Sequence, residues 1–163
     1  MSGRTLAILL GLLGAASVAL AAVAVLLGTK VAAAERTTER REAAVAAARQ
    51  AGVNLATMDY RHADADVRRL MSSLTGSARQ EMAKTGQKQV VAQLGKVKTW
   101  SVGQVLSAGV VSSDADSAQV LVVVDQTVRS KDVPNGVVHH LRWQMTVDRT
   151  GGRWLVSKLE PTE

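Results

Sequence analysis

The longest apolar run in the chain covers residues 6–28, which include no charged residue, amide or proline. As an α-helix with a rise of about 1.5 Å per residue, this run would be roughly 34 Å long, enough to cross a hydrocarbon core of about 30 Å. Arg4 bounds the run on one side and Lys30 on the other. The pattern therefore predicts a short N-terminal tail over residues 1–5 and a transmembrane helix over residues 6–28 that lies in the lipid bilayer.

A cleaved signal peptide is the alternative interpretation of this run. Its apolar region would cover only about 7–15 residues and would end at small residues. The run over residues 6–28 is longer than that, although residues 32–34 are all alanine and could imitate a cleavage site. We therefore favour an uncleaved, single-pass anchor.

Charge alone does not decide which side of the membrane holds the rest of the chain. Arg4 and the amino terminus lie before the apolar run, and four basic residues follow it closely: Lys30, Arg36, Arg40 and Arg41. That count would keep the C-terminal side in the cytoplasm, but long domains cross membranes largely regardless of charge. The orientation stays open at this point.

Residues 29–51 are rich in Ala, Glu and Arg, which are strong helix formers, and predict a helical stalk. Its apolar side is mostly alanine. The stalk is either a solvated spacer, which we favour, or a helix that packs closely against another helix. Gly52 and Asn54 are expected to loosen the helix, and the residues after them begin an α+β domain over residues 52–163.

Two further helices are predicted in the first half of this domain. One begins near His62 to Asp64 and ends at Thr75-Gly76, and the next covers Ser77 to Leu94. Apolar residues recur in both at the spacing of one helix face. The expected core residues of this half are Val53, Leu55, Met58, Val67, Leu70, Met71, Leu74, Met82, Val90, Val91 and Leu94.

After Gly95 the pattern changes to that of β-strands. Strands are predicted over Trp100–Val111, Ala118–Val128, Leu141–Asp148 and Trp154–Leu159. In the third of these, apolar and polar residues alternate strictly, which is typical of a strand with one buried face. Gly103 and Gly109 suggest bends or bulges in the first strand. Helices followed by an antiparallel meander indicate an α+β fold with helices packed on one face of a curved sheet. Three tryptophans in the sheet are expected to supply much of the core volume: Trp100, Trp143 and Trp154.

Composition excludes several classes of function. The net charge is +6, yet no basic run is longer than two residues, which argues against a nucleic-acid partner and fits weak attraction to anionic lipid near the anchor. The chain lacks cysteine, so disulfides, thiolate catalysis and cysteine-based zinc sites are excluded.

The His-x-Asp-x-Asp cluster of His62, Asp64 and Asp66 is the strongest candidate for a metal site. At two-residue spacing on a helix start these side chains would point apart, by about 200° for each step. Capping of the helix N-terminus is the better explanation. His139 and His140 are adjacent in a strand and should face opposite sides, so they are not expected to share a ligand.

Asp125 and Asp148 lie within strands and are candidates for a catalytic base inside a cone-shaped pocket. A site of the steroid-isomerase type would need one such carboxylate facing inward, with a donor pair that forms an oxyanion hole. Tyr60 is the one tyrosine of the chain, and nothing in the sequence completes that pair. Phosphate-binding loops, Walker signatures and serine elbows are absent from the sequence.

Several stretches together resemble the actinobacterial Mce-associated membrane proteins, which are encoded beside the Mce (mammalian cell entry) lipid-import systems. Those in the helical half are residues 53–60, 64–66 and 74–76, and those in the sheet are residues 107–112, 120–128 and 152–161. The valine-rich strand ending in Asp125-Gln126-Thr127-Val128 and the Trp154-Leu155-Val156-Ser157 ending are fairly specific. The chain departs from the family in one place, because residues 77–81 include no aromatic side chain.

The resemblance implies an inner-membrane, single-pass protein with a cytoplasmic N-terminus and an extracytoplasmic domain. Its expected fold is nuclear-transport-factor-2-like or cystatin-like, similar to that of type IV secretion assembly factors. The family is regarded as accessory, so we expect no catalytic residues, cofactor or metal, and we expect Mce transporter subunits or related membrane anchors as partners. Whether the chain forms an oligomer stays open.

Two alternatives use the same fold. In the first, the cone holds a small lipid ligand against Met145, Val147 and similar residues, and the chain is a carrier. In the second, the chain is an isomerase or cyclase that depends on Asp125 or Asp148. The fold alone does not choose among these functions.

Overall fold

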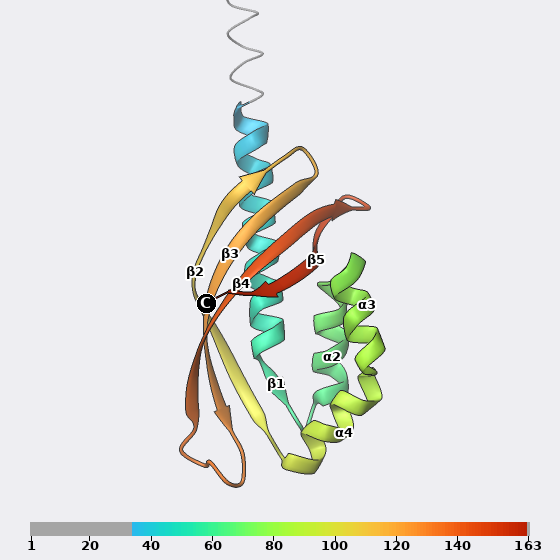
Figure 1. The fold of residues 1–163 in the computed structure, drawn as a ribbon, viewed down its shortest axis with the longest axis vertical. Helices are drawn as coiled ribbons and strands as arrows, with labels where there is room; N and C mark the ends of the chain where they lie inside the picture. The colour runs from blue at the N-terminus through green and yellow to red at the C-terminus, as the bar shows by residue number, and fades with distance from the viewer. Residues whose placement is uncertain (1–33, 163) are drawn as a thin grey trace, which may run out of the picture. The chain divides into compact units, whose positions relative to one another are not determined.

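The computed structural model describes residues 34–162 (Figure 1). The predicted tail and transmembrane helix over residues 1–28 lie outside the described residues. Of the helices within the described part, none is both long enough and apolar enough to cross a bilayer. The chain divides into two compact units, Met1–Glu39 and Arg40–Glu163. In the first unit residues 34–39 are helical, and the fold described below is that of the second unit.

The second unit is an α+β domain with helices packed on a curled antiparallel sheet. In this unit, helical residues 40–56 are followed by a group of shorter helices: α2 (Ala63–Ser72), α3 (Gly76–Thr85) and α4 (Gln87–Val97). The sheet has the order β1-β2-β3-β4-β5 and consists of β1 (Met58–Asp59), β2 (Trp100–Ser113), β3 (Ser117–Arg129), β4 (Val137–Thr150) and β5 (Arg153–Pro161). All neighbouring strands in it are antiparallel, so the predicted fold class and meander are confirmed. The two-residue strand β1 was not predicted.

The core lies between the helices and one face of the sheet, here called the inner face. In β3 the inner face consists of Ala118, Val120, Val122 and Val124, all of them buried. In β4 the inner side chains are Leu141, Trp143, Met145 and Val147, so the predicted alternation is confirmed. The helix α2 contributes Val67, Leu70 and Met71, with Leu74 just after it, also as predicted.

From Ala44 onward the alanine-rich helix packs directly on the inner face, which corrects its interpretation as a solvated spacer for that part. Residues 34–43 are exposed, apart from the half-buried Arg40. Ala44, Ala48 and Ala51 are fully or almost fully buried in the core cluster. Gly52 does not loosen the helix, which continues to residue 56. A β-carbon built on Gly52 would lie 3.4 Å from the side chain of Val122, so the glycine lets the helix lie close to the sheet. The prediction failed because it used only the low intrinsic helix propensity of glycine. Close packing of this helix on the sheet favours a glycine at position 52 and outweighs that propensity.

The predicted third helix is in fact two helices. Gly86 separates α3 from α4 and has a φ of 79°, a conformation that glycine adopts without the steric cost of a side chain. The Gly86 N–H donates to the carbonyl of Ala83, which ends α3. Met82, Val90 and Val91 pack against the core as expected, but they are only partly buried.

Two features of β2 differ from the predictions. Its register shifts fall between Val105 and Ser107 and between Val110 and Ser112, so Leu106 and Val111 are the extra residues, and the bulges are not at Gly103 or Gly109. A β-carbon on Gly103 would overlap with that of Ala56, so this position needs a glycine because the end of the helix lies so close to the strand.

The tryptophans were also overrated as core residues. Trp143 and Trp154 lie partly buried at the margin of the core cluster. Trp100 lies outside it, with the Arg129 guanidinium 4.8 Å above its ring. The largest fully buried side chains are Leu70, Met145 and a set of valines.

Candidate functional site

The outer face of the sheet, opposite the helices, is the most distinctive surface of the described residues. Among the side chains of β2, β3 and β4 that point away from the core are Val102, Leu106, Val111, Leu121, Val123, Asp125, Thr127, Val138, His140 and Arg142. The polar side chains of Gln119, Gln144, Thr146 and Asp148 lie on the same face. None of the described helices covers this face (Figure 1).

Apolar side chains are unusually exposed on the outer face. Leu106 is 52% exposed and Val111 is 61% exposed, because each is the extra residue of a bulge. Val102 and Val138 face the same Thr127 from the two neighbouring strands, and both are about half exposed. Contiguous exposed apolar side chains on a folded domain commonly mark an interaction site.

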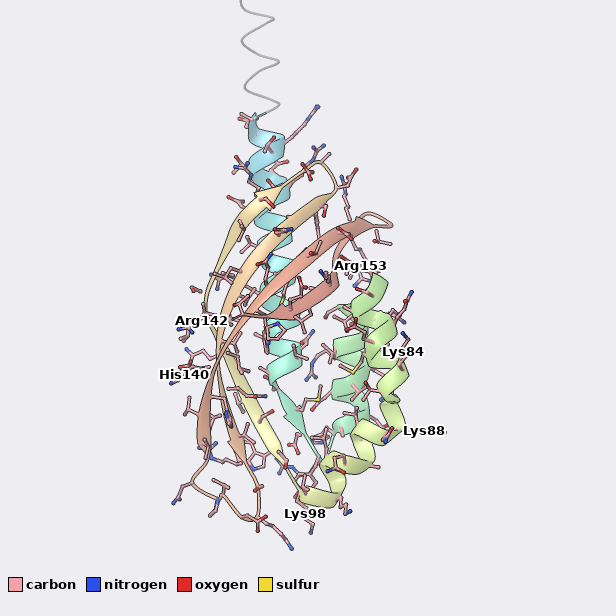
Figure 2. All side chains as sticks on the ribbon, in the orientation of Figure 1. Lys84, Lys88, Lys98, His140, Arg142 and Arg153 are labelled. Atoms are coloured by element: carbon pink, nitrogen blue, oxygen red, sulfur yellow. The ribbon has the colours of Figure 1, made fainter. Side chains whose placement is uncertain are left out.

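The charged groups of the outer face lie beside this apolar surface. Asp125 and His140 are paired in register, with 2.6 Å between the Asp125 Oδ1 and the His140 Nδ1 atoms. Arg142 lies two residues further along β4, and its side chain makes no hydrogen bond or ion pair with any described residue. Figure 2 shows His140 and Arg142 on the side of the sheet away from the helices.

Neither candidate catalytic aspartate lies where a base inside a cone-shaped pocket would have to be. Asp125 alternates with the buried Val124 and faces outward, and Asp148 likewise alternates with Val147. The Asp148 Oδ1 atom accepts a hydrogen bond from the Ser117 hydroxyl at 2.6 Å. The alternative in which one of these carboxylates lies inside a cone does not fit this arrangement, because both are on the opposite face of the sheet.

The side chains proposed to line a lipid cavity fill the core instead. Met145 and Val147 have no exposed surface and belong to the core cluster. A groove of about 270 Å³ with a mixed polar and apolar lining lies at the margin, between helical residues 40–56, the end of α2 and the start of β5. Neither Met145 nor Val147 lines that groove.

The His-x-Asp-x-Asp cluster does not converge on a metal position. Asp66 is almost fully buried; its carboxylate accepts the Asp59 backbone N–H at 2.8 Å and pairs with Arg69 at 2.8 Å. His62 is the N-cap residue of α2, yet no side chain caps this helix start, so the capping prediction is wrong in that detail. Within residues 34–162 no group of three or more His, Cys, Asp and Glu side chains is placed to hold a metal.

A tight ion pair lies in the loop before α2. The Arg61 guanidinium is 2.6 Å from the Asp59 carboxylate and holds the pKa of that carboxyl at about 2, although partial burial opposes the shift. Tyr60, the candidate oxyanion donor, is half-buried with the Arg61 guanidinium 5.9 Å from its ring centre. His139 is opposite Gln126 in the register, and His140 is opposite Asp125, so the two histidines face different sides, as expected.

Several solved structures share this α+β fold of helices packed on a curled antiparallel sheet. A periplasmic fragment of TraM has a TM-score of 0.58 at 12% identity, with 75% of this chain and 96% of that chain covered. The periplasmic domain of DotI has a TM-score of 0.56 at 13% identity, covering 72% and 91%. A scytalone dehydratase homologue from Novosphingobium aromaticivorans has a TM-score of 0.55 at 12% identity, covering 80% and 89%. At these identities the similarity concerns the fold alone.

The chain belongs to the family described as Uncharacterized protein Rv1363c/MT1408-like, whose model matches residues 5–162. Uncharacterized protein Rv1362c of Mycobacterium tuberculosis is 34% identical over 120 residues, which cover 73% of this chain and 54% of that protein. Outer membrane protein Rv1973 of the same organism is 42% identical over 62 residues, covering 37% and 38%. The chain thus matches only about half, or less, of the length of these relatives.

Proposed function

We propose that this chain is a non-enzymatic accessory protein that stabilises or helps assemble an Mce-type lipid or sterol import complex. The outer face of the sheet is the surface that binds a transporter subunit or a related membrane anchor. The observation that carries this proposal is the exposed apolar surface of β2, β3 and β4 beside Arg142. Such a combination of apolar side chains and an arginine is typical of protein interfaces.

The proposal places the domain in the cell envelope. Residues 6–28 would span the inner membrane with the N-terminus in the cytoplasm and the domain outside it. The printed titles of the DotI and TraM structures describe periplasmic domains, and a relative is called an outer membrane protein, which supports an envelope location. An anchor also raises the effective concentration of the domain near a membrane-bound partner.

The alternatives gain no support from the interior of the fold. A lipid carrier of the kind predicted would need space beside Met145 and Val147, which are fully buried. An isomerase or cyclase of the kind predicted would need an inward carboxylate at Asp125 or Asp148. We therefore advance no second function.

The test is affinity purification of the tagged full-length protein from membranes in mild detergent, followed by mass spectrometry of the retained proteins. We expect Mce proteins or their permease to be enriched over an unrelated single-pass control. The double variant Leu106→Ser with Val138→Ser reduces the apolar area of the outer face and should lose most of this enrichment.

The matched control is Val97→Ser, which removes a valine that is 44% exposed but lies on α4, away from the outer face. It should retain the partners at the wild-type level. Equal retention by the double variant would exclude the outer face as the binding surface. If the wild-type protein is purified without any Mce component, the accessory function itself is wrong.

A further inference from the structure

The segment Met82–Ser113 carries positive charge without any compensation in its own sequence. It includes four lysines, Lys84, Lys88, Lys96 and Lys98, and no aspartate or glutamate. None of the four makes an ion pair or side-chain hydrogen bond with a residue that the structure describes. Elsewhere in the domain, acidic and basic residues are interspersed, and several pair, as Asp66 does with Arg69 and Lys158 with Glu160.

These lysines lie on and beside α4, at the surface of the helical layer. Figure 2 shows Lys84 and Lys88 on the side of α3 and α4 that faces away from the sheet, with Lys98 at the end of α4. Lys84 is in the last turn of α3, and Lys96 is in the last turn of α4. We call this the α3–α4 surface, defined by the four lysines and the apolar residues of α4.

The apolar side of α4 is incompletely covered. Within the described part of the chain, no residue of α4 is buried, and Val97 is 44% exposed. A shallow hollow of about 360 Å³ opens beside the helix and is lined by Thr85, Gln89, Val90, Gln93 and Leu94. The result is an amphipathic helix with lysines beside a partly open apolar side, which is the pattern of helices that lie at a membrane surface.

We propose that the α3–α4 surface binds the surface of an anionic lipid bilayer. Four unpaired ammonium groups attract anionic headgroups, and each lysine near such a surface strengthens binding by about fivefold. Val97, the exposed large apolar residue of α4, then contacts the boundary between headgroups and acyl chains, together with the partly exposed Val90 and Leu94 at the hollow. This inference goes beyond the accessory function proposed above and does not depend on it.

The charge pattern favours a bilayer over an acidic protein. Protein interfaces are enriched in arginine and aromatic residues and depleted in lysine. The α3–α4 surface has the opposite composition, because all its cations are lysines and the segment from Met82 to Thr99 includes no aromatic residue. Lysine is a flexible point charge that needs no fixed geometry in its partner, which suits a fluid array of headgroups.

The experiment uses the full-length chain held in discs of neutral phosphatidylcholine. These discs are mixed with vesicles of phosphatidylcholine alone or of phosphatidylcholine with phosphatidylglycerol, and the protein that floats with the vesicles is measured. We expect flotation with the anionic vesicles at low salt, loss of flotation at high salt, and little flotation with the neutral vesicles. Equal flotation with both kinds of vesicle would overturn the proposal.

The decisive variant is Lys84→Gln with Lys88→Gln and Lys96→Gln, which should weaken vesicle binding by about 100-fold. Its matched control removes the same charge elsewhere, through Lys131→Gln, Arg149→Gln and Lys158→Gln, and should bind nearly as the wild type does. All six side chains are on exposed residues, and circular dichroism would verify that both variants fold.

Equal losses in the two triple variants would mean that net charge alone causes binding, and the proposal would be wrong. Binding to polyglutamate tests the competing interpretation, in which the α3–α4 surface binds an acidic protein. If immobilised polyglutamate captures the discs while anionic vesicles do not, the α3–α4 surface is a docking site for an acidic protein, and the lipid proposal is overturned.

Discussion

The two faces of β3 belong to the same strand but have opposite environments. Val120, Val122 and Val124 have no exposed surface, whereas Leu121 between them is 38% exposed. The inner face packs against an alanine-rich helix, and the outer face has no described helix on it. The comparison shows that apolar residue type alone does not define the core here, because both faces carry valine and leucine.

The two faces also differ in how they use small residues. On the inner face, glycine and alanine let a helix lie close to the sheet, as at Gly52 and Gly103. On the outer face, Gly109 has open space where a side chain would be. Stability should therefore respond to changes on the inner face, whereas binding should respond to changes on the outer face.

The largest difference is expected for a carboxylate placed on either face. Val122→Asp would bury an unpaired carboxylate in the core and should destabilise the domain by at least about 4 kcal/mol, enough to prevent folding. Leu121→Asp places the same group on the outer face and should cost less than about 1 kcal/mol. Urea denaturation of the two variants measures this; similar losses would contradict the assignment of the faces.

A smaller but still clear difference is expected for glycine. Gly103→Ala would make its β-carbon clash with that of Ala56 and should cost about 3 kcal/mol. Gly109→Ala meets no atom within 4 Å and should change stability by less than about 0.5 kcal/mol. The double variant Gly103→Ala with Ala56→Gly should recover much of the loss, and a failure to recover would show that this contact is not its cause.

The smallest difference concerns hydrogen bonds. The Ser101 hydroxyl is buried and donates to the Ala56 carbonyl at 2.9 Å, so Ser101→Ala should cost about 1–2 kcal/mol. Asp125→Asn weakens the exposed pair with His140 and should cost less than about 0.5 kcal/mol. Thermal unfolding of both variants tests this order, and a reversed order would mean that the outer pair stabilises the fold.

The sequence predicted those parts of the fold in which local pattern and packing agree. The alternation around Met145 and Val147 gave the correct inner face of β4, and Val67 and Leu70 gave the correct face of α2. The predictions failed at two glycines in opposite ways, because the effect of a glycine on a helix depends on packing and backbone conformation that the local pattern does not show. Gly52 instead lies within a helix that packs on the sheet, and Gly86 divides a helix that was predicted to be continuous.

The candidate site was harder to predict, for two physical reasons. Valine occupies three successive positions, 122–124, so the run hides which side of the strand Asp125 takes. Leu106 and Val111 are exposed through bulges, which interrupt the alternation on which the prediction rests. The alternation in β4 predicts that Arg142 lies on the outer face. That its side chain has no ionic partner among the described residues depends on the fold.

The bulges of β2 affect whether copies of this protein associate at high concentration. Beyond Ser101, β2 has no described strand neighbour on the side away from β3, so it is an edge of the sheet. A straight, regular edge would present evenly spaced amide and carbonyl groups to another molecule and could begin aggregation. The extra residues at Leu106 and Val111 break that spacing. Many copies of the domain can therefore crowd together without their sheets joining through the β2 edge.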